Sequence, residues 1–137
     1  MILRPATDDD EMIFYWLRNE PHALRASRRP VITKEEHHQW WTHTSDHLWV
    51  AERPYTPDAT YITLGTIRLG ADGTVSIIVS PDLRGQGIGA QMLTLLEPEA
   101  RALGYRRMWA EIAPENARSQ KCFLKAGWAP ILMEKSV

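Results

Sequence analysis

A glycine-rich stretch in the second half of the chain decides the fold: Val75-Ser-Ile-Ile-Val-Ser-Pro-Asp-Leu-Arg-Gly-Gln-Gly-Ile-Gly-Ala90. Residues 75–80 are apolar enough to predict a buried central strand, and from Gln86 the pattern becomes helical. The loop between them contains Gly85, Gly87 and Gly89. Glycines allow a ligand to approach the backbone closely, and the free N–H groups at a helix start attract an anion. The junction therefore predicts a phosphate or pyrophosphate site.

Two other phosphate-binding motifs fit this stretch less well. A P-loop requires Lys-Ser or Lys-Thr after its glycines, and neither follows here. The pattern Gly85-x-Gly87-x-x-Ala90 fits a dinucleotide-binding fingerprint, and Glu111 stands about where a ribose-binding acid belongs. That motif normally opens its fold, however, and too little chain follows Ala90 for the remaining parallel strands. A dinucleotide-binding protein stays a remote alternative.

Hydrophobic periodicity and capping signals around the loop predict an α/β (α+β) fold. We expect a mostly antiparallel first half and a β-α-β-α second half, with residues 19–32 irregular. Asp72-Gly73 is a hairpin signal, and Pro98 is expected to kink or split its helix near residues 94–97. The expected strands are residues 2–4, 48–52, 61–69, 75–80, 107–113 and 129–134, and the expected helices are residues 8–18, 34–44, 86–104 and 117–126.

Size and composition exclude several classes of protein. The chain has 137 residues, which predicts a single domain over residues 1–137. Its formal net charge of −1 argues against a general nucleic-acid binder. The one cysteine, Cys122, excludes an internal disulfide and a cysteine-based zinc site. No apolar run approaches the ~20 residues that span a bilayer, and Met1–Pro5 lacks a signal-peptide core. We therefore expect a cytoplasmic protein with no membrane or nucleic-acid partner.

The glycine loop resembles the signature of the GCN5-related N-acetyltransferases (GNAT). That signature, Gln/Arg-x-x-Gly-x-Gly/Ala, reads Arg84-Gly-Gln-Gly-Ile-Gly89 here. A second block, Asn116-Ala-Arg-Ser-Gln-Lys-Cys-Phe-Leu-Lys-Ala-Gly-Trp128, looks like the family's Asn-x-x-Ser/Ala-x-x-x-Tyr/Phe-x-Lys-x-Gly-Phe. The two motifs stand in the right order and at the right distance. The resemblance implies the GNAT fold, with a central mixed, mostly antiparallel sheet, a splayed strand pair and about four helices.

The resemblance also implies acetyl-CoA as cosubstrate and no metal. In the family, loop amides hold the pyrophosphate of coenzyme A, and the preceding strand holds the pantetheine arm. The residues that this implies for cofactor binding are Ile77, Ile78, Val79, Arg84, Gly85, Gln86, Gly87, Ile88, Gly89, Ala90, Asn116, Ser119 and Phe123.

Three short stretches resemble a narrower branch of the family: residues 18–21, 32–40 and 64–68. This branch contains acetyltransferases of amino-sugar nucleotides, as in pseudaminic acid biosynthesis, and shades into ribosomal-protein N-terminal acetyltransferases. The implied function is acetyl transfer to a primary amine of a small molecule, with an amino-sugar nucleotide favoured, by direct attack in a ternary complex. A protein N-terminal acetyltransferase and a non-catalytic acyl-CoA-binding module remain alternatives.

Direct attack requires a neutral amine, so some group must accept its proton. Glu111 and His37 are the candidate residues, and a water chain is a third option. A backbone N–H near Val79 is the candidate donor to the oxyanion. Phe123 stands where many relatives carry a tyrosine general acid, and it has no proton to give. Cys122 is expected to be a small buried residue rather than a nucleophile.

Aromatic and basic residues complete the expectations. Trp16, Trp49, Trp109 and Trp128 are expected in the core. One of the adjacent Trp40 and Trp41 is expected either to line the acceptor cleft or to make a subunit contact. Basic side chains in the irregular segment would attract the phosphates of a nucleotide-sugar; they are Arg25, Arg28 and Arg29.

His43 and His47 would have metal-ligand spacing if the helix extended as far as His47, but no third ligand is evident beyond Asp46, so no metal site is expected. The short stretch after Trp128 leaves room for one strand, and an exposed edge strand favours pairing. We therefore expect a homodimer that acts on a small-molecule amine.

Overall fold

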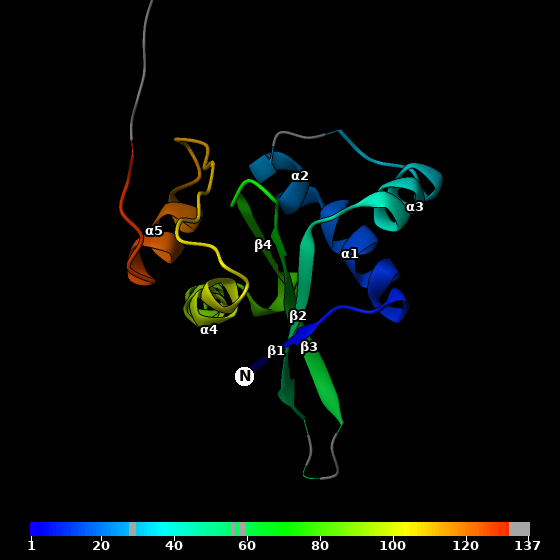
Figure 1. Cartoon of the computed structure of the whole chain (residues 1–137), viewed down its shortest axis with the longest axis horizontal. Helices are drawn as coiled ribbons and strands as arrows, with labels where there is room; N and C mark the ends of the chain where they lie inside the picture. Colours follow the sequence, from blue (N-terminus) through cyan, green and yellow to red (C-terminus); the bar gives the residue numbers. More distant parts are fainter. Residues whose placement is uncertain (28–29, 56, 58–59, 132–137) are drawn as a thin grey trace, which may run out of the picture.

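A four-stranded antiparallel sheet forms the centre of the molecule (Figure 1). The computed structural model describes residues 1–27, 30–55, 57 and 60–131. Within these residues the strand order is β1-β2-β3-β4. The strands are β1 (Ile2–Pro5), β2 (His47–Pro54), β3 (Tyr61–Leu69) and β4 (Val75–Val79). The expected boundaries of β3 are confirmed, because alternating apolar residues bounded by turn signals specify it locally.

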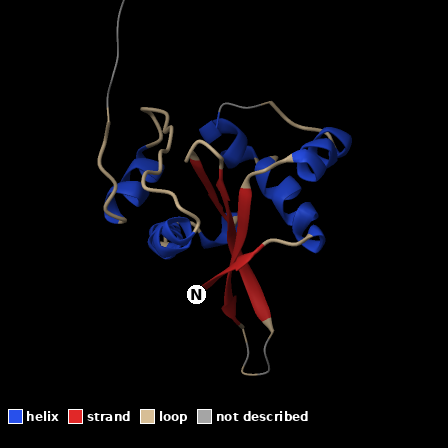
Figure 2. Cartoon of the chain, in the orientation of Figure 1, coloured by secondary structure: helices blue, strands red, loops and turns tan. Residues whose placement is uncertain are grey.

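Helices cover both faces of this sheet (Figure 2). One face carries α1 (Glu11–Arg18), α2 (Pro21–Ser27) and α3 (Lys34–His43), and the other carries α4 (Ile88–Ala102) with α5 (Ala117–Lys125) beside it. Short 3₁₀ turns, Asp8–Asp10 and Pro81–Leu83, precede α1 and follow β4. The predicted fold class is confirmed. Among the described residues, no helix combines the length and apolar character that a membrane crossing requires.

The main core lies between the sheet and α4. Met92, Leu93 and Leu96 of α4 are almost fully buried, and they pack in one cluster with Ile67 and Leu69 of β3. Their helical spacing is the reason α4 presents one continuous apolar face. Because α4 begins at the end of the glycine loop, this packing also fixes the loop at the edge of the sheet.

The expectation of irregular structure for residues 19–32 is wrong, because α2 forms there. Pro21 occupies the first helical position, where the missing N–H removes no helix hydrogen bond. The Glu20 carboxylate caps the same turn by accepting hydrogen bonds from the amides of His22 (3.1 Å) and Ala23 (3.2 Å). Arg28 and Arg29, which belonged to the predicted basic cluster, lie outside the described residues.

Pro98 does not split α4, which runs unbroken from Ile88 to Ala102. Leu96 and Ala100 are buried on either side of the exposed proline. Their packing outweighs the one hydrogen bond that proline removes. The other helix signals are confirmed: Thr33 and Glu36 form the capping box of α3, and the Asn116 side chain caps α5 by accepting from the Ser119 amide.

The strand expected at residues 107–113 does not form. Only one parallel bridge, between Thr74 and Trp109, joins this segment to β4. Its hydrogen bonds run from the Val75 amide to the Trp109 carbonyl (2.7 Å) and from the Trp109 amide to the Gly73 carbonyl (2.8 Å). Beyond the bridge the segment forms no ladder with β4. Residues 129–131 form no strand either, and the rest of that expected strand lies outside the described residues.

Two of the tryptophans expected in the core are exposed. Trp16 is 69% exposed and Trp109 is 42% exposed. Trp16 is two positions beyond the buried Phe14, which puts it about 200° around α1. Trp109 lies in the segment without a strand ladder. Trp49 is buried as expected, and Trp128 packs its ring on Phe123 with centroids 4.8 Å apart.

Candidate active site

A cleft of about 1110 Å³ runs along the outer edge of β4, beside residues 110–116. It gathers the three candidate catalytic residues, Glu111, His37 and Val79. It also gathers every expected cofactor residue except Gln86, which is exposed: Ile77, Ile78, Val79, Arg84, Gly85, Gly87, Ile88, Gly89, Ala90, Asn116, Ser119 and Phe123. These residues are far apart in sequence. They meet in one place because β4 and residues 110–116 diverge from each other.

The glycine loop has the geometry of an anion cradle. Gly85 and Gly87 have left-handed backbone angles, with φ values of +81° and +76°. Gly87 directly precedes α4, whose N-terminal amides and dipole favour negative charge. A Cβ atom on Gly87 would lie 3.3 Å from Nζ of Lys125, so this ammonium lies directly beside the loop. The bare backbone, the helix end and the cation together fit a pyrophosphate.

Gly89 serves a different purpose, which is close packing. A Cβ atom there would lie 2.6 Å from the Cys122 sulfur and 3.3 Å from Ile77 Cδ1. The missing side chain lets α4, α5 and β4 approach each other. Burial raises the pKa of the Cys122 thiol, although the charge of Lys125 opposes this effect. The thiol is therefore protonated at neutral pH, as suits a packing residue rather than a nucleophile.

Three basic residues of α5 that line the cleft were not among the site residues predicted from the sequence: Arg118, Lys121 and Lys125. Their spacing of three and four residues puts them on one helix face, which is the signal that could have identified them. This face adds positive charge to the half of the cleft that contains the glycine loop. We call it the cofactor half.

The Arg84 side chain is engaged within the protein. Its Nη2 atom lies 2.6 Å from Oε2 of Glu20, and both side chains are about five-sixths buried, at 16% and 15% exposed. Burial opposes ionisation of Glu20, but the hydrogen bond from Arg84 and the amides of His22 and Ala23 together lower its pKa to about 2. The two groups therefore form a charged pair at neutral pH.

The other half of the cleft, which we call the acceptor half, is lined by α1–α3 and the facing side of β3 and β4. It is basic and aromatic, with Arg18, His22, Arg25, Trp40 and Arg68 among its residues. Along the described part of the whole cleft the acids are Glu111 and Glu115.

Two cations of the acceptor half, Arg68 and Arg25, are held by neighbouring groups. The Arg68 guanidinium lies 6.0 Å from the Trp40 ring and 3.8 Å from Asp46 Oδ2. Arg25 Nη2 lies 2.7 Å from His22 Nδ1 on the same helix. The cations are thus placed beside flat rings, an arrangement that suits a planar, anionic ligand.

His37 is 1% exposed and lies within an aromatic cluster on α3. Its ring centroid lies 5.5 Å from that of Tyr15 and 5.4 Å from that of Trp40. Burial lowers the pKa of His37, and the charge of Glu11 only partly offsets this. Among the described residues, no hydrogen-bond partner reaches its Nδ1 atom.

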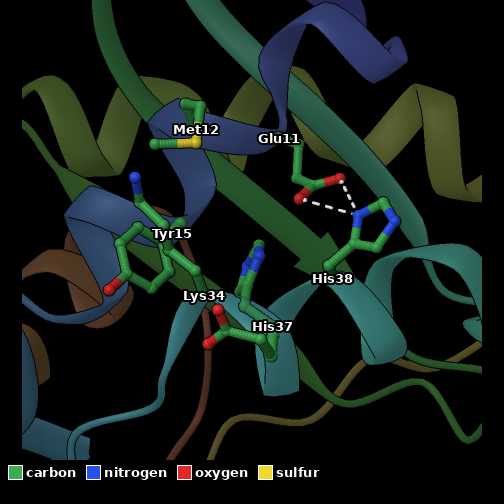
Figure 3. Close-up of a pocket in the computed structure, with 7 residues that line it drawn as sticks. Glu11, Met12, Tyr15, Lys34, His37 and His38 are labelled. Atoms are coloured by element: carbon green, nitrogen blue, oxygen red, sulfur yellow. Dashed lines mark hydrogen bonds and ion pairs between the residues drawn. The ribbon is translucent and has the colours of Figure 1, made fainter.

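His37 also lines a shallow neighbouring pocket, shown in Figure 3. In that view it lies between Tyr15 and the hydrogen-bonded side chains of Glu11 and His38. His37 is thus a neutral imidazole that borders two cavities. The suggested spacing of His43 and His47 does not apply, because α3 ends at His43 and His47 begins β2.

Glu111 is exposed at the rim of the cleft, and Phe123 is buried within it. The Phe123 ring packs edge-on against Trp128. Val79 lies at the end of β4, whose outer edge borders the cleft because no further strand pairs with it in the described sheet. The arrangement offers a carboxylate and an imidazole as proton acceptors, and no acid at position 123.

Comparison with known proteins gives a consistent result. The model of the acetyltransferase (GNAT) family matches residues 11–128. An uncharacterised N-acetyltransferase, YobR of Bacillus subtilis (strain 168), is 33% identical over 70 residues, which are 50% of this chain and 28% of that protein. The chain thus aligns with little more than a quarter of this curated relative.

Solved structures resemble most of this chain in fold. A domain from Methanocaldococcus jannaschii DSM 2661 has a TM-score of 0.80 and 24% identity, covering 92% of this chain and 86% of that one. The spermidine N-acetyltransferase from Vibrio cholerae, in complex with CoA and spermine, has a TM-score of 0.72 and 15% identity, covering 91% and 78%. At these identities the likeness concerns the fold.

Proposed function

This chain belongs to the acetyltransferase (GNAT) family, and from that premise we propose that it transfers the acetyl group of acetyl-CoA to the primary amine of a small anionic molecule. An amino-sugar nucleotide is the acceptor class that we favour. The observation that carries this choice is the charge of the acceptor half of the cleft, where arginines and Trp40 gather.

Charge complementarity favours an anion over a polyamine in this position. Positively charged clefts raise the local concentration of anions and repel cations. Arginine also suits phosphate recognition because its planar fork can donate two parallel hydrogen bonds. A sugar or base can stack on a ring such as that of Trp40. A polyamine or an aminoglycoside would bring further positive charge to Arg25 and Arg68.

The cofactor half fits the anionic part of coenzyme A. The amides of the glycine loop and the ammonium of Lys125 would hold the pyrophosphate, and the open edge of β4 would hold the pantetheine arm. This chain's own residues thus orient the thioester toward the acceptor half. Acetyl-CoA supplies the activated acetyl group.

The reaction that we propose is direct transfer. The amine nitrogen bonds to the acetyl carbon, the carbon–sulfur bond breaks, and the amine proton passes to a base. Glu111 and His37 are the proton acceptors that line the cleft, and the neutral state of His37 leaves it able to take a proton. A backbone N–H near Val79 would stabilise the oxyanion. Since Phe123 donates no proton, the thiolate takes its proton from solvent.

Calorimetric titration with acetyl-CoA tests the cofactor assignment, with NAD as comparison and Gly87→Glu as the blocked control. Thiol release is then measured with four amines: a uridine-diphosphate amino sugar, the free amino sugar, spermidine and a peptide with a free N-terminus. We expect saturable binding that is lost in the variant, and release with the nucleotide sugar alone. Absence of binding would overturn the proposal.

Other results would select the alternatives. Binding without thiol release would indicate an acyl-CoA-binding module, and release with the peptide would indicate a protein N-terminal acetyltransferase. The homodimer, the single domain over residues 1–137 and the cytoplasmic location stay predictions.

A further inference from the structure

Glu20 lies at the junction between α1 and α2, and it holds both helices. Its amide donates to the Leu17 carbonyl of α1 at 3.3 Å, and its carbonyl accepts from the Leu24 amide of α2 at 3.0 Å. Its carboxylate caps α2 through the amides of His22 and Ala23. The orientation of α2 therefore depends on where this carboxylate is held.

The group that holds the carboxylate comes from the glycine loop. Arg84 reaches Glu20 across 64 positions of sequence, with a nitrogen–oxygen distance of 2.6 Å. A Cβ atom on Gly85 would have no neighbour within 4 Å, so the loop is open at that position. The ion pair joins the loop to the first turn of α2, which carries His22, Ala23 and Arg25 along the acceptor half.

We propose that Arg84 is a positioning residue rather than a phosphate ligand, and that its pair with Glu20 links the occupancy of the cofactor half to the orientation of α2 in the acceptor half. The inference rests on the proposed function, because it takes the loop to bind the pyrophosphate of acetyl-CoA. Lys125, whose Nζ lies beside Gly87, is a cation that would contact that pyrophosphate instead.

Moving the Arg84 guanidinium onto a phosphate would break its pair with Glu20. Its Nη2 atom is bound to Glu20 in a mostly buried site, and freeing it would leave the carboxylate with the amides of His22 and Ala23 but without this cation, which is unfavourable. A bound anion that orders the loop therefore also orders α2 through this ion pair. Because the pKa of Glu20 is about 2, the pair stays ionised throughout the range from about pH 6 to pH 8 in which the assay would run.

A double-mutant cycle measures this link. The variants are Glu20→Gln, Arg84→Gln, the two combined, and Arg84→Lys, which keeps the charge. The matched control is Arg101→Gln, which breaks the exposed pair of Arg101 with Glu97 on α4. For each protein, acetyl-CoA affinity is measured by calorimetry and amide hydrogen exchange is followed with and without acetyl-CoA.

We expect each single glutamine variant to weaken acetyl-CoA binding by about tenfold, and the combined variant by no more, because both remove one link. Acetyl-CoA should slow amide exchange in residues 22–25 of the wild type and of Arg101→Gln. That slowing should disappear in the glutamine variants and partly return in Arg84→Lys. Circular dichroism confirms folding, and Arg84→Lys keeps the test valid where a glutamine variant is unstable.

Three results would overturn the inference. The first is a much larger loss of affinity for Arg84→Gln than for Glu20→Gln, with additive effects in the combination, as expected of a phosphate ligand. The second is tighter binding in Glu20→Gln, as expected of a released arginine. The third is unchanged slowing of exchange in α2. A wild type that does not bind acetyl-CoA would overturn the proposed function as well, so the two failures are distinguishable.

Discussion

At the scale of single residues, backbone conformation and burial determine what the site can do. Gly87 has a φ of +76°, and a Cβ atom there would contact the ammonium of Lys125. His37 is a buried imidazole whose Nδ1 atom has no hydrogen-bond partner among the described residues. A side chain at the first position would be strained in the left-handed region. Protonation at the second would place a charge in an aromatic cluster, where Glu11 only partly compensates it.

Gly87→Ala is expected to weaken acetyl-CoA binding by about tenfold or more, because the methyl group both strains the backbone and crowds Lys125 Nζ. Gly104→Ala is the matched control, since Gly104 also has a positive φ, of +94°, but has no neighbour within 4 Å and lies outside the cleft. Calorimetry should show normal binding for the control and a similar small loss of stability in both. Equal binding by the two variants would contradict the cradle.

Acidification is expected to destabilise the fold through His37. Its pKa is lowered in the folded state, so between that value and about 6.5 the unfolded chain binds more protons, and stability falls as pH falls. This contribution is complete above about pH 6.5 and has a slope of at most about 1.4 kcal/mol per pH unit. Urea unfolding at several pH values measures it.

The His37→Phe variant should lose this part of the pH dependence, whereas His43→Gln, which replaces an exposed histidine of the same helix, should keep it.

The same His37 variant and Glu111→Gln, assayed for thiol release, identify the proton acceptor. A pH profile of kcat that is unchanged in both would point to a water chain.

At the scale of secondary-structure elements, the position of a proline decides whether it begins a helix or weakens one. Pro21 begins α2, where no N–H is required, whereas Pro98 lies inside α4. The first is a favourable helix position and the second costs a hydrogen bond that only packing offsets.

Pro98→Ala is therefore expected to raise the free energy of unfolding by about 1–3 kcal/mol, because alanine restores the missing hydrogen bond and has the highest helix propensity. Pro21→Ala, the matched control, should leave stability unchanged or slightly lower. Denaturant unfolding compares them. A loss of stability in Pro98→Ala would mean that the ring is needed for packing.

At the scale of the whole molecule, the two halves of the cleft come from different parts of the chain. The cofactor half comes from the second half of the chain, where α4 and α5 pack together. The acceptor half comes from α1–α3 and one face of the sheet. The Glu20–Arg84 pair is a direct link between the two.

Arg25→Gln is expected to raise KM for a uridine-diphosphate amino sugar by about tenfold while leaving acetyl-CoA affinity unchanged, because the lost charge belongs to the acceptor half. Added salt should weaken acceptor binding less in the variant than in the wild type. Arg101→Gln, at an exposed position of α4 that does not line the cleft, should behave as wild type. An effect on acetyl-CoA affinity alone would place Arg25 in the cofactor half.

Local rules in the sequence determined β3, the capping of α3 and α5, and the glycine loop before α4. These features depend on residues that are close in sequence, where periodicity, a cap or a turn acts directly. The family resemblance also came from two such local motifs, and the match to the family over residues 11–128 confirms it.

Only the tertiary structure decided the rest. Exposed and half-buried residues alternate along 107–112 as in a strand. A strand also requires a partner that stays alongside, and this segment meets the start of β4 at a single bridge. Trp16 and Trp109 are apolar, but their exposure depends on what distant segments cover. Arg84 matches a cofactor motif, yet its guanidinium is bound by Glu20 of the N-terminal half. Contacts of this kind join residues with no local relation, so no pattern along the chain predicts them.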